Sequence, residues 1–444
     1  MENKKVKIIA TIGPASDSEA VLKKLMLSGV NVFRLNFSHA TPDYFAKVIK
    51  RINKLKKKLR INVVTFLDLP GPKIRTGILP NGKFEIKEGE RYILGPNGDI
   101  PVSKSLLKAL PSKGKISLSD GKIQIEPLQR IKNGIVVEAL DDGTLLNNQS
   151  INAANLIYEK KYPTNNDIAG IRFGLRHGIN VFALSFVSRK EDIQKARRFT
   201  GKNSIIITKV ERDSAVKDFS EIANESDVIM IARGDLGLNI DMVKVPFIQR
   251  KLIKEANKLC KPIITATQVL ESMIRNPIPT RAELDDTFTA IMEGTDAIML
   301  SEETAIGSFP VKSVQTLRKL IDFNYKKLNP TRYPIKVEED ALIDDVVDLA
   351  RNTRIKSIIM KTSNGKNVLK LSRYHIDADI FAITNDTNTA NLLSFSRGVI
   401  PIHSNRTSSA FKAVNKNYNV SRAIMVYDVP RGKKAETGLN IINL

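Results

Sequence analysis

Short runs of apolar, often β-branched residues recur along the chain, and most of them stop at charged or hydroxyl-bearing residues. Buried parallel strands show this pattern when their last residues emerge at a polar edge. Amphipathic helical patterns separate the runs. The strand-like runs are Lys7–Ile12, Val30–Phe37, Val63–Leu69, Val181–Val187, Ser204–Glu211, Asp227–Arg233, Pro262–Gln268 and Ala297–Glu303. Eight parallel strand–helix units predict a TIM barrel whose active site lies at the carboxyl ends of the strands.

The alternation of strands and helices stops after the third of these strands. From residue 71 to residue 155 the chain has short alternating runs separated by turn dipeptides. These dipeptides are Asn81-Gly82, Asn97-Gly98, Asp120-Gly121, Asn133-Gly134 and Asp142-Gly143. Alternating apolar residues flank Asp120-Gly121, so Lys115–Ile125 is predicted to form a hairpin with a two-residue turn. The whole segment, called the lid below, is predicted to be a separate β domain.

The alternation of strands and helices resumes after residue 155 with the last five barrel strands. Past Asn329-Pro330 a third segment also alternates helix and strand, with strand runs at Ser357–Lys361, Ile380–Thr384, Val399–His403 and Ala423–Val429. We therefore expect an α/β protein in three parts. A (β/α)8 TIM barrel comprises residues 1–70 and 156–330, and an inserted small β-barrel lid domain comprises residues 71–155. A C-terminal open α/β domain comprises residues 331–444.

Charged residues gather where the fifth and sixth strand runs end. Lys209 and Glu211 are two positions apart, so in a strand their side chains point to the same face. Asp235 ends the next strand motif. One ammonium and two carboxylates at one edge of a barrel suit a divalent metal and an anionic substrate. A purely structural lysine–carboxylate pair is the alternative.

Other strand ends carry polar side chains with the same alternation. Arg34, Asn36 and Ser38 share one face of the second strand, and Thr265 and Thr267 share one face of the seventh. Capping of the following helix would explain Ser38, but it would not explain an arginine on the inner face of a barrel.

The composition narrows the class of protein. The 444 residues are 42% hydrophobic and 26% charged, and no apolar run reaches the length of a membrane span. The first residues lack the long apolar segment of a signal peptide. With one cysteine, Cys260, and four dispersed histidines, neither a disulfide nor a zinc site is expected. These features favour a cytoplasmic enzyme.

The formal net charge of +23 raises the question of nucleic-acid binding. The lysines are scattered, however, and the densest run, from Lys54 to Arg60, lies on a predicted helix as a solvated face. Few aromatic residues accompany it for base stacking. A basic field also attracts phosphorylated metabolites. We therefore expect no nucleic-acid and no membrane partner, with nucleic-acid binding as the minor alternative.

Seven motifs occur in an order that resembles the pyruvate kinase family across nearly the whole chain. They are Ile-Ile-Ala-Thr-Ile-Gly-Pro-Ala-Ser, Phe-Arg-Leu-Asn-Phe-Ser-His, Gly-Pro-Lys-Ile-Arg-Thr-Gly, Thr-Lys-Val-Glu, Ala-Arg-Gly-Asp-Leu-Gly, Ala-Thr-Gln-Val-Leu-Glu-Ser-Met and Pro-Thr-Arg-Ala-Glu-Leu-Asp-Asp. The lid segment also lies where that family has its inserted domain, after the third strand. The resemblance implies transfer of the phosphoryl group of phosphoenolpyruvate to ADP, which gives pyruvate and ATP in the last ATP-forming step of glycolysis.

The resemblance also implies roles for individual residues. The implied catalytic and substrate-binding residues are Arg34, Ser185, Lys209, Gly234, Asp235 and Thr267, and the implied nucleotide-side residues are Asn36, His39 and Arg75. Glu211 and Asp235 match the ligands of Mg²⁺, for which Mn²⁺ is a substitute. Lys209 matches the lysine that stabilises charge on the transferring phosphoryl group, and Thr267 lies near the carbon that receives a proton. Backbone N–H groups of Gly234 and Asp235 are expected to bind the substrate carboxylate.

Two segments depart from the family pattern. Many members bind K⁺ through residues that match Asn36, Ser38, Asp68 and the carbonyl of Leu69, and they carry Glu where this chain has Lys73. The tethered ammonium of Lys73 can supply the charge of a monovalent ion and repel that ion, so the resemblance is to a K⁺-independent subgroup. In the lid, Leu146–Ser150 has no match to the family's nucleotide lysine, whereas Asp120 matches an acidic residue and also suits a turn.

The C-terminal segment resembles the family's regulatory domain. Its loop of Thr362, Ser363, Asn364, Gly365 and Lys366 follows a strand and precedes a helix, as a phosphate-binding effector loop does. A plain strand–helix turn is the alternative. The family also implies a homotetramer. Two further readings stay open: a catalytically silent relative that binds a ligand or nucleic acid, and another barrel that handles phosphoenolpyruvate or oxaloacetate.

Overall fold

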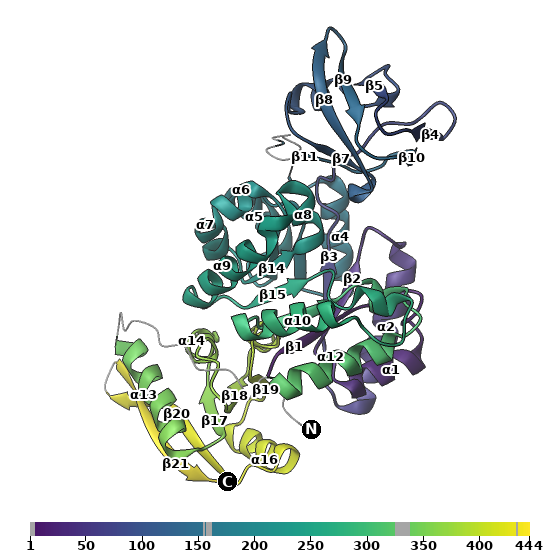
Figure 1. Ribbon diagram of the computed structural model, residues 1–444. Coiled ribbons are helices and arrows are strands. Elements are labelled where there is room, and N and C mark those ends of the chain that lie inside the picture. The colour runs from purple at the N-terminus through teal and green to yellow at the C-terminus, as the bar shows by residue number, and fades with distance from the viewer. Residues whose placement is uncertain (1–4, 154–155, 157–161, 325–337, 432–433) are drawn as a thin grey trace.

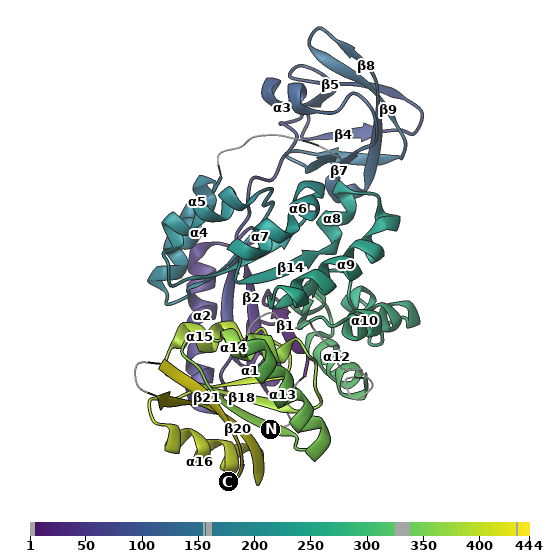
Figure 2. The ribbon, with the colours of Figure 1, turned by 90° about the vertical axis from the view of Figure 1, so that its left-hand side faces the viewer.

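The computed structural model describes residues 5–153, 156, 162–324, 338–431 and 434–444. Figures 1 and 2 show three parts in a row, with a central barrel, the lid beyond one end of it and the C-terminal domain against the other end. The predicted domain boundary near residue 155 borders undescribed residues, and the boundary at 330 falls among them. The domain limits therefore stay a prediction.

Eight parallel strands close the barrel, as predicted, in the order β1-β16-β15-β14-β13-β12-β3-β2. The strands are β1 (Lys7–Thr11), β2 (Val32–Asn36), β3 (Val64–Asp68), β12 (Val181–Leu184), β13 (Ile205–Val210), β14 (Val228–Ala232), β15 (Ile263–Ala266) and β16 (Ala297–Leu300). Each lies inside the run predicted for it. One apolar cluster fills the barrel interior, and a second lies between the strands and the surrounding helices.

The helices around the barrel begin where the sequence offers capping side chains. Thr41 caps the first turn of α2 with Pro42 following, and Thr164 and Thr280 form capping boxes with Asp167 and Glu283. The helices are α1 (Glu19–Ser28), α2 (Pro42–Leu59), α4 (Asn165–Arg176), α5 (Lys190–Thr200), α6 (Asp213–Lys217), α7 (Phe219–Glu225), α8 (Arg233–Asn239), α9 (Val245–Lys258), α10 (Arg281–Glu293), α11 (Glu302–Ala305) and α12 (Pro310–Asn324). Among the described residues, no helix is both long and apolar enough to cross a membrane.

The lid is an all-β unit built around its own core. Its strands are β4 (Lys83–Ile86), β5 (Arg91–Gly95), β6 (Ile100–Pro101), β7 (Ile116–Leu118), β8 (Ile123–Ile131), β9 (Gly134–Ala139), β10 (Gly143–Leu146) and β11 (Ile151–Ala153), with the short helix α3 (Lys104–Ala109). Hydrogen bonds join them into a six-stranded sheet, β11-β7-β8-β9-β5-β6, and a two-stranded sheet, β10-β4. Both sheets contribute to the one core.

The hairpin between β7 and β8 differs from its prediction in the length of the turn. Leu118 pairs with Ile123, so four residues connect the strands where two were expected. Ser119 through Gly121 form a short 3-10 turn, η1, in which Ser119 and Gly121 both have positive φ. The Asp-Gly dipeptide therefore lies within this turn but does not make it alone, because Ser119 also leaves the extended conformation.

The C-terminal domain has a five-stranded sheet in the order β19-β18-β17-β20-β21. Its strands are β17 (Ser357–Lys361), β18 (Asp379–Thr384), β19 (Val399–His403), β20 (Arg422–Arg431) and β21 (Lys434–Asn443), and its helices are α13 (Glu338–Thr353), α14 (Lys366–Ser372), α15 (Thr387–Leu393) and α16 (Thr407–Tyr418). Four strands were predicted. The fifth, β21, pairs antiparallel with β20 at the edge of an otherwise parallel sheet.

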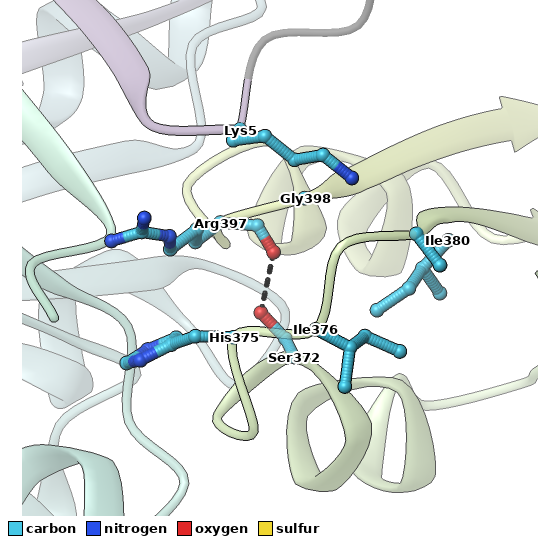
Figure 3. Close-up of a pocket in the computed structure, with 8 residues that line it drawn as sticks. Lys5, Ser372, His375, Ile376, Ile380, Arg397 and Gly398 are labelled. Atoms are coloured by element: carbon cyan, nitrogen blue, oxygen red, sulfur yellow. Dashed lines mark hydrogen bonds between the residues drawn. The ribbon is translucent and has the colours of Figure 1, made fainter. Parts of the chain in front are cut away.

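The C-terminal domain inserts side chains into the amino end of the barrel. Phe395 belongs to the apolar cluster inside the barrel, with its ring 6.4 Å from that of Phe66. Lys7 donates from Nζ to the carbonyl of Val399 at 2.5 Å. Figure 3 shows the adjoining cavity, where the Ser372 hydroxyl donates to the carbonyl of Arg397. This end of the barrel is therefore closed by packing and hydrogen bonds.

We expect loss of the Phe395 ring, which joins the C-terminal domain to the barrel, to destabilise the protein strongly. Phe395→Ala should lower the free energy of unfolding by about 3–5 kcal/mol, because a fully buried ring leaves a cavity between two domains. Phe323→Ala is the control, since that ring is 70% exposed and its loss should change stability little. Denaturant unfolding measures both, and equal stabilities of the two variants would contradict the packing role.

Candidate active site

The ammonium of Lys209 lies at the centre of a buried group of side chains at the carboxyl end of the barrel. Its Nζ is 2.8 Å from Oε1 of Glu211 and 3.4 Å from Oδ1 of Asp68. It also donates to Oγ of Ser185 at 2.8 Å. These four residues come from three neighbouring strands or the residues just after them, namely β3, β12 and β13. The structure thus brings together residues that the sequence placed only at separate strand ends.

Arg34 joins the same group through Asp68. Its Nε and NH2 lie 2.8 Å and 2.7 Å from Oδ2 of Asp68, and its NH1 donates to the hydroxyl of Thr11. Ser185 donates to the other oxygen of Asp68 at 3.3 Å. Asp68 therefore holds both cations, Arg34 and Lys209, on one carboxylate. Two fixed positive groups close together suit an anionic substrate.

Burial and charge shift the pKa values of this group in different directions. Burial alone would lower the pKa of Lys209, but the charges of Asp68, Glu211 and Asp235 outweigh it and raise that pKa. Burial would likewise raise the pKa of Asp68, but Lys209 and Arg34 lower it. Burial raises the pKa of Glu211 to about 7 against the pull of Lys209. Lys209 therefore stays charged at neutral pH, whereas Glu211 is poised to exchange a proton.

Glu211 and Asp235 supply a donor set that fits Mg²⁺. Glu211 is fully buried, and although Lys209 lies close to its Oε1, the geometry leaves that oxygen without an aligned hydrogen bond. A buried oxygen with a free lone pair is available to a cation. Within the described chain, no group of three His, Cys, Asp or Glu side chains is arranged to hold a metal. Two carboxylates match an ion that takes its other ligands from substrate and water.

Thr267 stands in a strained turn at the end of β15. Its φ is 65° and that of Gln268 is 51°, a region that residues other than glycine seldom adopt. The backbone N–H of Gly234 donates to the Thr267 hydroxyl at 2.8 Å, and that hydroxyl lies 2.6 Å from the carbonyl of Ala266. The Gly234 N–H was expected to face a substrate carboxylate. In this structure it holds Thr267, because α8 begins beside that turn, and its contact with a substrate carboxylate stays a prediction.

Arg233 was not singled out from the sequence, yet it holds this turn in place. Its guanidinium donates to the carbonyls of Thr267 at 2.6 Å and Gln268 at 2.7 Å. The opposite edge pairs with Asp286 at 2.5 Å and reaches Gln249. Backbone carbonyls leave no mark in a sequence, so only the unusual arginine at the end of an apolar strand could have signalled the contact.

The predicted nucleotide-side residues lie around the mouth of the same end. Burial, with Arg34 and Lys73 nearby, lowers the pKa of His39. Asn36 accepts a hydrogen bond from the N–H of Ser38. Arg75 donates to the carbonyl of Asn148 in the lid, in the segment that lacks the family's lysine. Their contact with a nucleotide stays a prediction.

Among the residues predicted for a monovalent cation, Asp68 is the one already engaged by two positive side chains. The side chain of Leu69 is buried, whereas Ser38 is exposed. In the C-terminal loop, the N–H of Gly365 donates to the Thr362 hydroxyl and that of Lys366 donates to the Asn364 side chain. These two N–H groups therefore already have partners inside the loop, and its effector role, which includes Ser363, stays a prediction.

Comparisons with known proteins agree on one family. Residues 3–314 match the family described as "Pyruvate kinase, barrel domain", and residues 340–433 match "Pyruvate kinase, alpha/beta domain". The chain is 37% identical to a pyruvate kinase of Thermococcus litoralis, over 95% of this chain and 91% of that one. It is 36% identical to that of Thermotoga maritima, over 92% and 91%. A crystal structure of a pyruvate kinase from Cryptosporidium parvum superposes with a TM-score of 0.91 at 30% identity, over 99% and 96%.

The closed parallel barrel makes this chain a TIM-barrel protein, with buried cations and carboxylates at the end where such barrels have their active sites. The comparisons make the class narrower. The chain belongs to the pyruvate kinase family and is a kinase of the transferase class.

The titration of Glu211 predicts that divalent-cation binding depends on pH. A cation must displace the proton from this carboxyl, so the apparent affinity for Mg²⁺ should be highest above pH 8. It should fall by up to about tenfold per pH unit below the pKa of about 7. Calorimetric titration across this range measures the slope. Glu211→Gln should flatten it and Glu221→Gln, at an exposed position, should not; an unchanged slope in Glu211→Gln would contradict the assignment.

Proposed function

We propose that this protein transfers the phosphoryl group of phosphoenolpyruvate to ADP, forming pyruvate and ATP, with Mg²⁺ and without a need for K⁺. The observation that carries the proposal is the Lys209 ammonium fixed between Ser185, Asp68 and Glu211. Phosphoryl transfer demands positioning and charge neutralisation more than covalent chemistry, and this arrangement provides both.

Each charged side chain has its own role in the proposed transfer. Arg34, held by Asp68, binds phosphate oxygens, and Lys209 stabilises the negative charge that moves toward the enolate oxygen. A divalent cation bound to Glu211 and Asp235 would neutralise charge shared by the phosphoryl group and the enolate. The lid lies beyond this end of the barrel. A lid that covered the bound substrate would limit access of water and thereby strengthen these charge interactions.

Thr267 is assigned a role in the last proton transfer. Its hydroxyl is held by the Gly234 N–H and lies beside the Ala266 carbonyl. A threonine hydroxyl is too weak an acid to protonate carbon alone, so we assign it the placement of a water molecule that delivers the proton. Arg233 supports this role because it holds the turn that carries Thr267.

Lys73 supports the proposal of K⁺ independence. It follows the hinge glycine Gly71, to whose carbonyl its own backbone N–H donates. It is also close enough to His39 to lower the pKa of that side chain. A positive charge at this place does the work of a bound monovalent ion and disfavours binding of one.

Exposed apolar side chains support the proposal of a homotetramer. Met242, Val243 and Phe247 cluster at η2 (Met242–Lys244) and the start of α9, and they are 50%, 79% and 72% exposed. Contiguous exposed apolar residues mark surfaces that pack against a partner. The cytoplasmic location remains part of the same proposal, as does regulation by a phosphorylated effector at the C-terminal loop. A catalytically silent binding protein is the alternative function.

A coupled assay with lactate dehydrogenase tests the activity and its ion requirement together. With phosphoenolpyruvate, ADP and Mg²⁺, kcat should change by less than about twofold when K⁺ replaces a large inert cation at constant ionic strength. Lys73→Glu should lose activity without K⁺ and regain it with K⁺. Activation of the wild type by about tenfold or more would contradict K⁺ independence. Absence of turnover with either Mg²⁺ or Mn²⁺ would favour the silent alternative.

Removal of the Lys209 charge tests its role in the transition state. Lys209→Met should lower kcat by about 10²–10³ with little change in the KM for phosphoenolpyruvate, because the lost contact forms mainly in the transition state. Lys217→Met is the control, since that exposed lysine pairs within its own helix, with Asp213. Near-native turnover in a folded Lys209→Met variant would contradict the assignment.

A further inference from the structure

The two chain segments that join the lid to the barrel meet on one buried carboxylate. Asp167, in the first turn of α4, accepts a hydrogen bond from the N–H of Gly71 at 2.8 Å on one oxygen. Its other oxygen accepts from the N–H and the hydroxyl of Thr164, both at 2.7 Å. Gly71 lies on the segment that leaves the barrel after β3, and Thr164 lies on the segment that returns to α4. The positions of the two segments are therefore coupled.

Both segments also contact the backbone of Ser185. A Cβ placed on Gly71, which has a φ of 64°, would lie 2.6 Å from the carbonyl oxygen of Ser185, so the glycine permits a close approach. On the returning segment, the buried hydroxyl of Tyr162 donates to that same carbonyl oxygen at 3.3 Å. Burial raises the pKa of Tyr162 well above its ordinary value, so the hydroxyl keeps its proton and remains a donor.

Ser185 connects these contacts to the catalytic side chains. Its hydroxyl accepts from Lys209 and donates to Asp68, and the next residue, Phe186, donates its N–H to Oε2 of Glu211 at 2.7 Å. Phe186 has a φ of 58°, so the backbone directly after Ser185 is also strained. A shift of the Ser185 peptide would displace the partner of the Lys209 ammonium and the partner of the Glu211 carboxylate together.

We propose that Tyr162 and Gly71 are positioning residues that hold Ser185 in place and, through its hydroxyl, set the position of the Lys209 ammonium. The connections of the lid thereby influence the geometry of the catalytic cation directly, in addition to the role of the lid in excluding water. This inference rests on the proposed function of Lys209. It assigns Tyr162 no contact with the substrate.

Removal of one oxygen atom tests the inference. Tyr162→Phe should lower kcat by about three- to tenfold, the effect of losing one hydrogen bond, with the KM for phosphoenolpyruvate nearly unchanged. Tyr92→Phe is the matched control, because Tyr92 is also buried and its hydroxyl donates to Glu90 and accepts from the Lys87 N–H, both within the lid. A wild-type kcat in Tyr162→Phe would overturn the inference.

A double-mutant cycle separates positioning from general packing. If Tyr162 acts through the Ser185 hydroxyl, then Tyr162→Phe added to Ser185→Ala should lower kcat by less than about twofold beyond Ser185→Ala alone. Losses that multiply independently would overturn the inference. Thermal unfolding of all three variants checks that they are folded.

A readout without turnover distinguishes this inference from the proposed function. The NMR signal of the Lys209 ammonium, assigned by its loss in Lys209→Met, should shift in Tyr162→Phe and not in Tyr92→Phe. An unshifted signal in Tyr162→Phe would overturn the inference even in an active enzyme. If the wild type shows no turnover but the Lys209 signal still shifts in Tyr162→Phe, the proposed function is overturned and the positioning role is supported.

Discussion

The buried charge group around Lys209 constrains the order and register of the barrel strands that carry it. Moving an ammonium and two carboxylates out of water costs several kcal/mol per ion, and this cost is offset only when the charges pair and their remaining hydrogen-bonding capacity is used. Lys209 and Asp68 meet these conditions through Ser185 and Arg34. Glu211 meets them on one oxygen only, through the Phe186 N–H, and its other oxygen remains available to a cation. Because the partners come from the neighbouring strands β2, β3, β12 and β13, the group forms only when these strands pair in the observed order and register. A shift of one residue in β13 would turn Lys209 away from Asp68.

The two ends of the barrel bury different kinds of side chain. At the carboxyl end, charged and hydroxyl groups line a site beneath the lid. At the amino end, the Phe395 ring fills the interior, and Arg397 enters with its N–H on the carboxylate of Asp296. The amino end, where no substrate has to enter, is thus stabilised by packing. The opposite end can therefore hold buried charged groups at some cost in stability.

Backbone strain also gathers at the carboxyl end. Phe186, Thr267 and Gln268 all have positive φ, and each lies just after a barrel strand. Charged side chains hold them in place, with Glu211 on the N–H of Phe186 and Arg233 on the carbonyls of the other two. The buried charged side chains therefore also fix the loops, so a change in one of them is expected to alter its neighbours.

The eight barrel strands could be predicted from the sequence, together with the strand ends that carry Arg34, Lys209, Glu211 and Asp235, because burial on both faces imposes an apolar run with polar ends. The sequence did not show the length of the β7–β8 turn, which depends on the backbone of Ser119. It also missed β21, an edge strand without a clear alternating pattern. Which side chains and backbone groups are in contact depends on the tertiary structure. Arg233 acts on carbonyls, and Tyr162 reaches the backbone of Ser185. Such contacts join a side chain to a peptide carbonyl, a group that every residue carries, so no pattern along the chain shows which carbonyl is contacted.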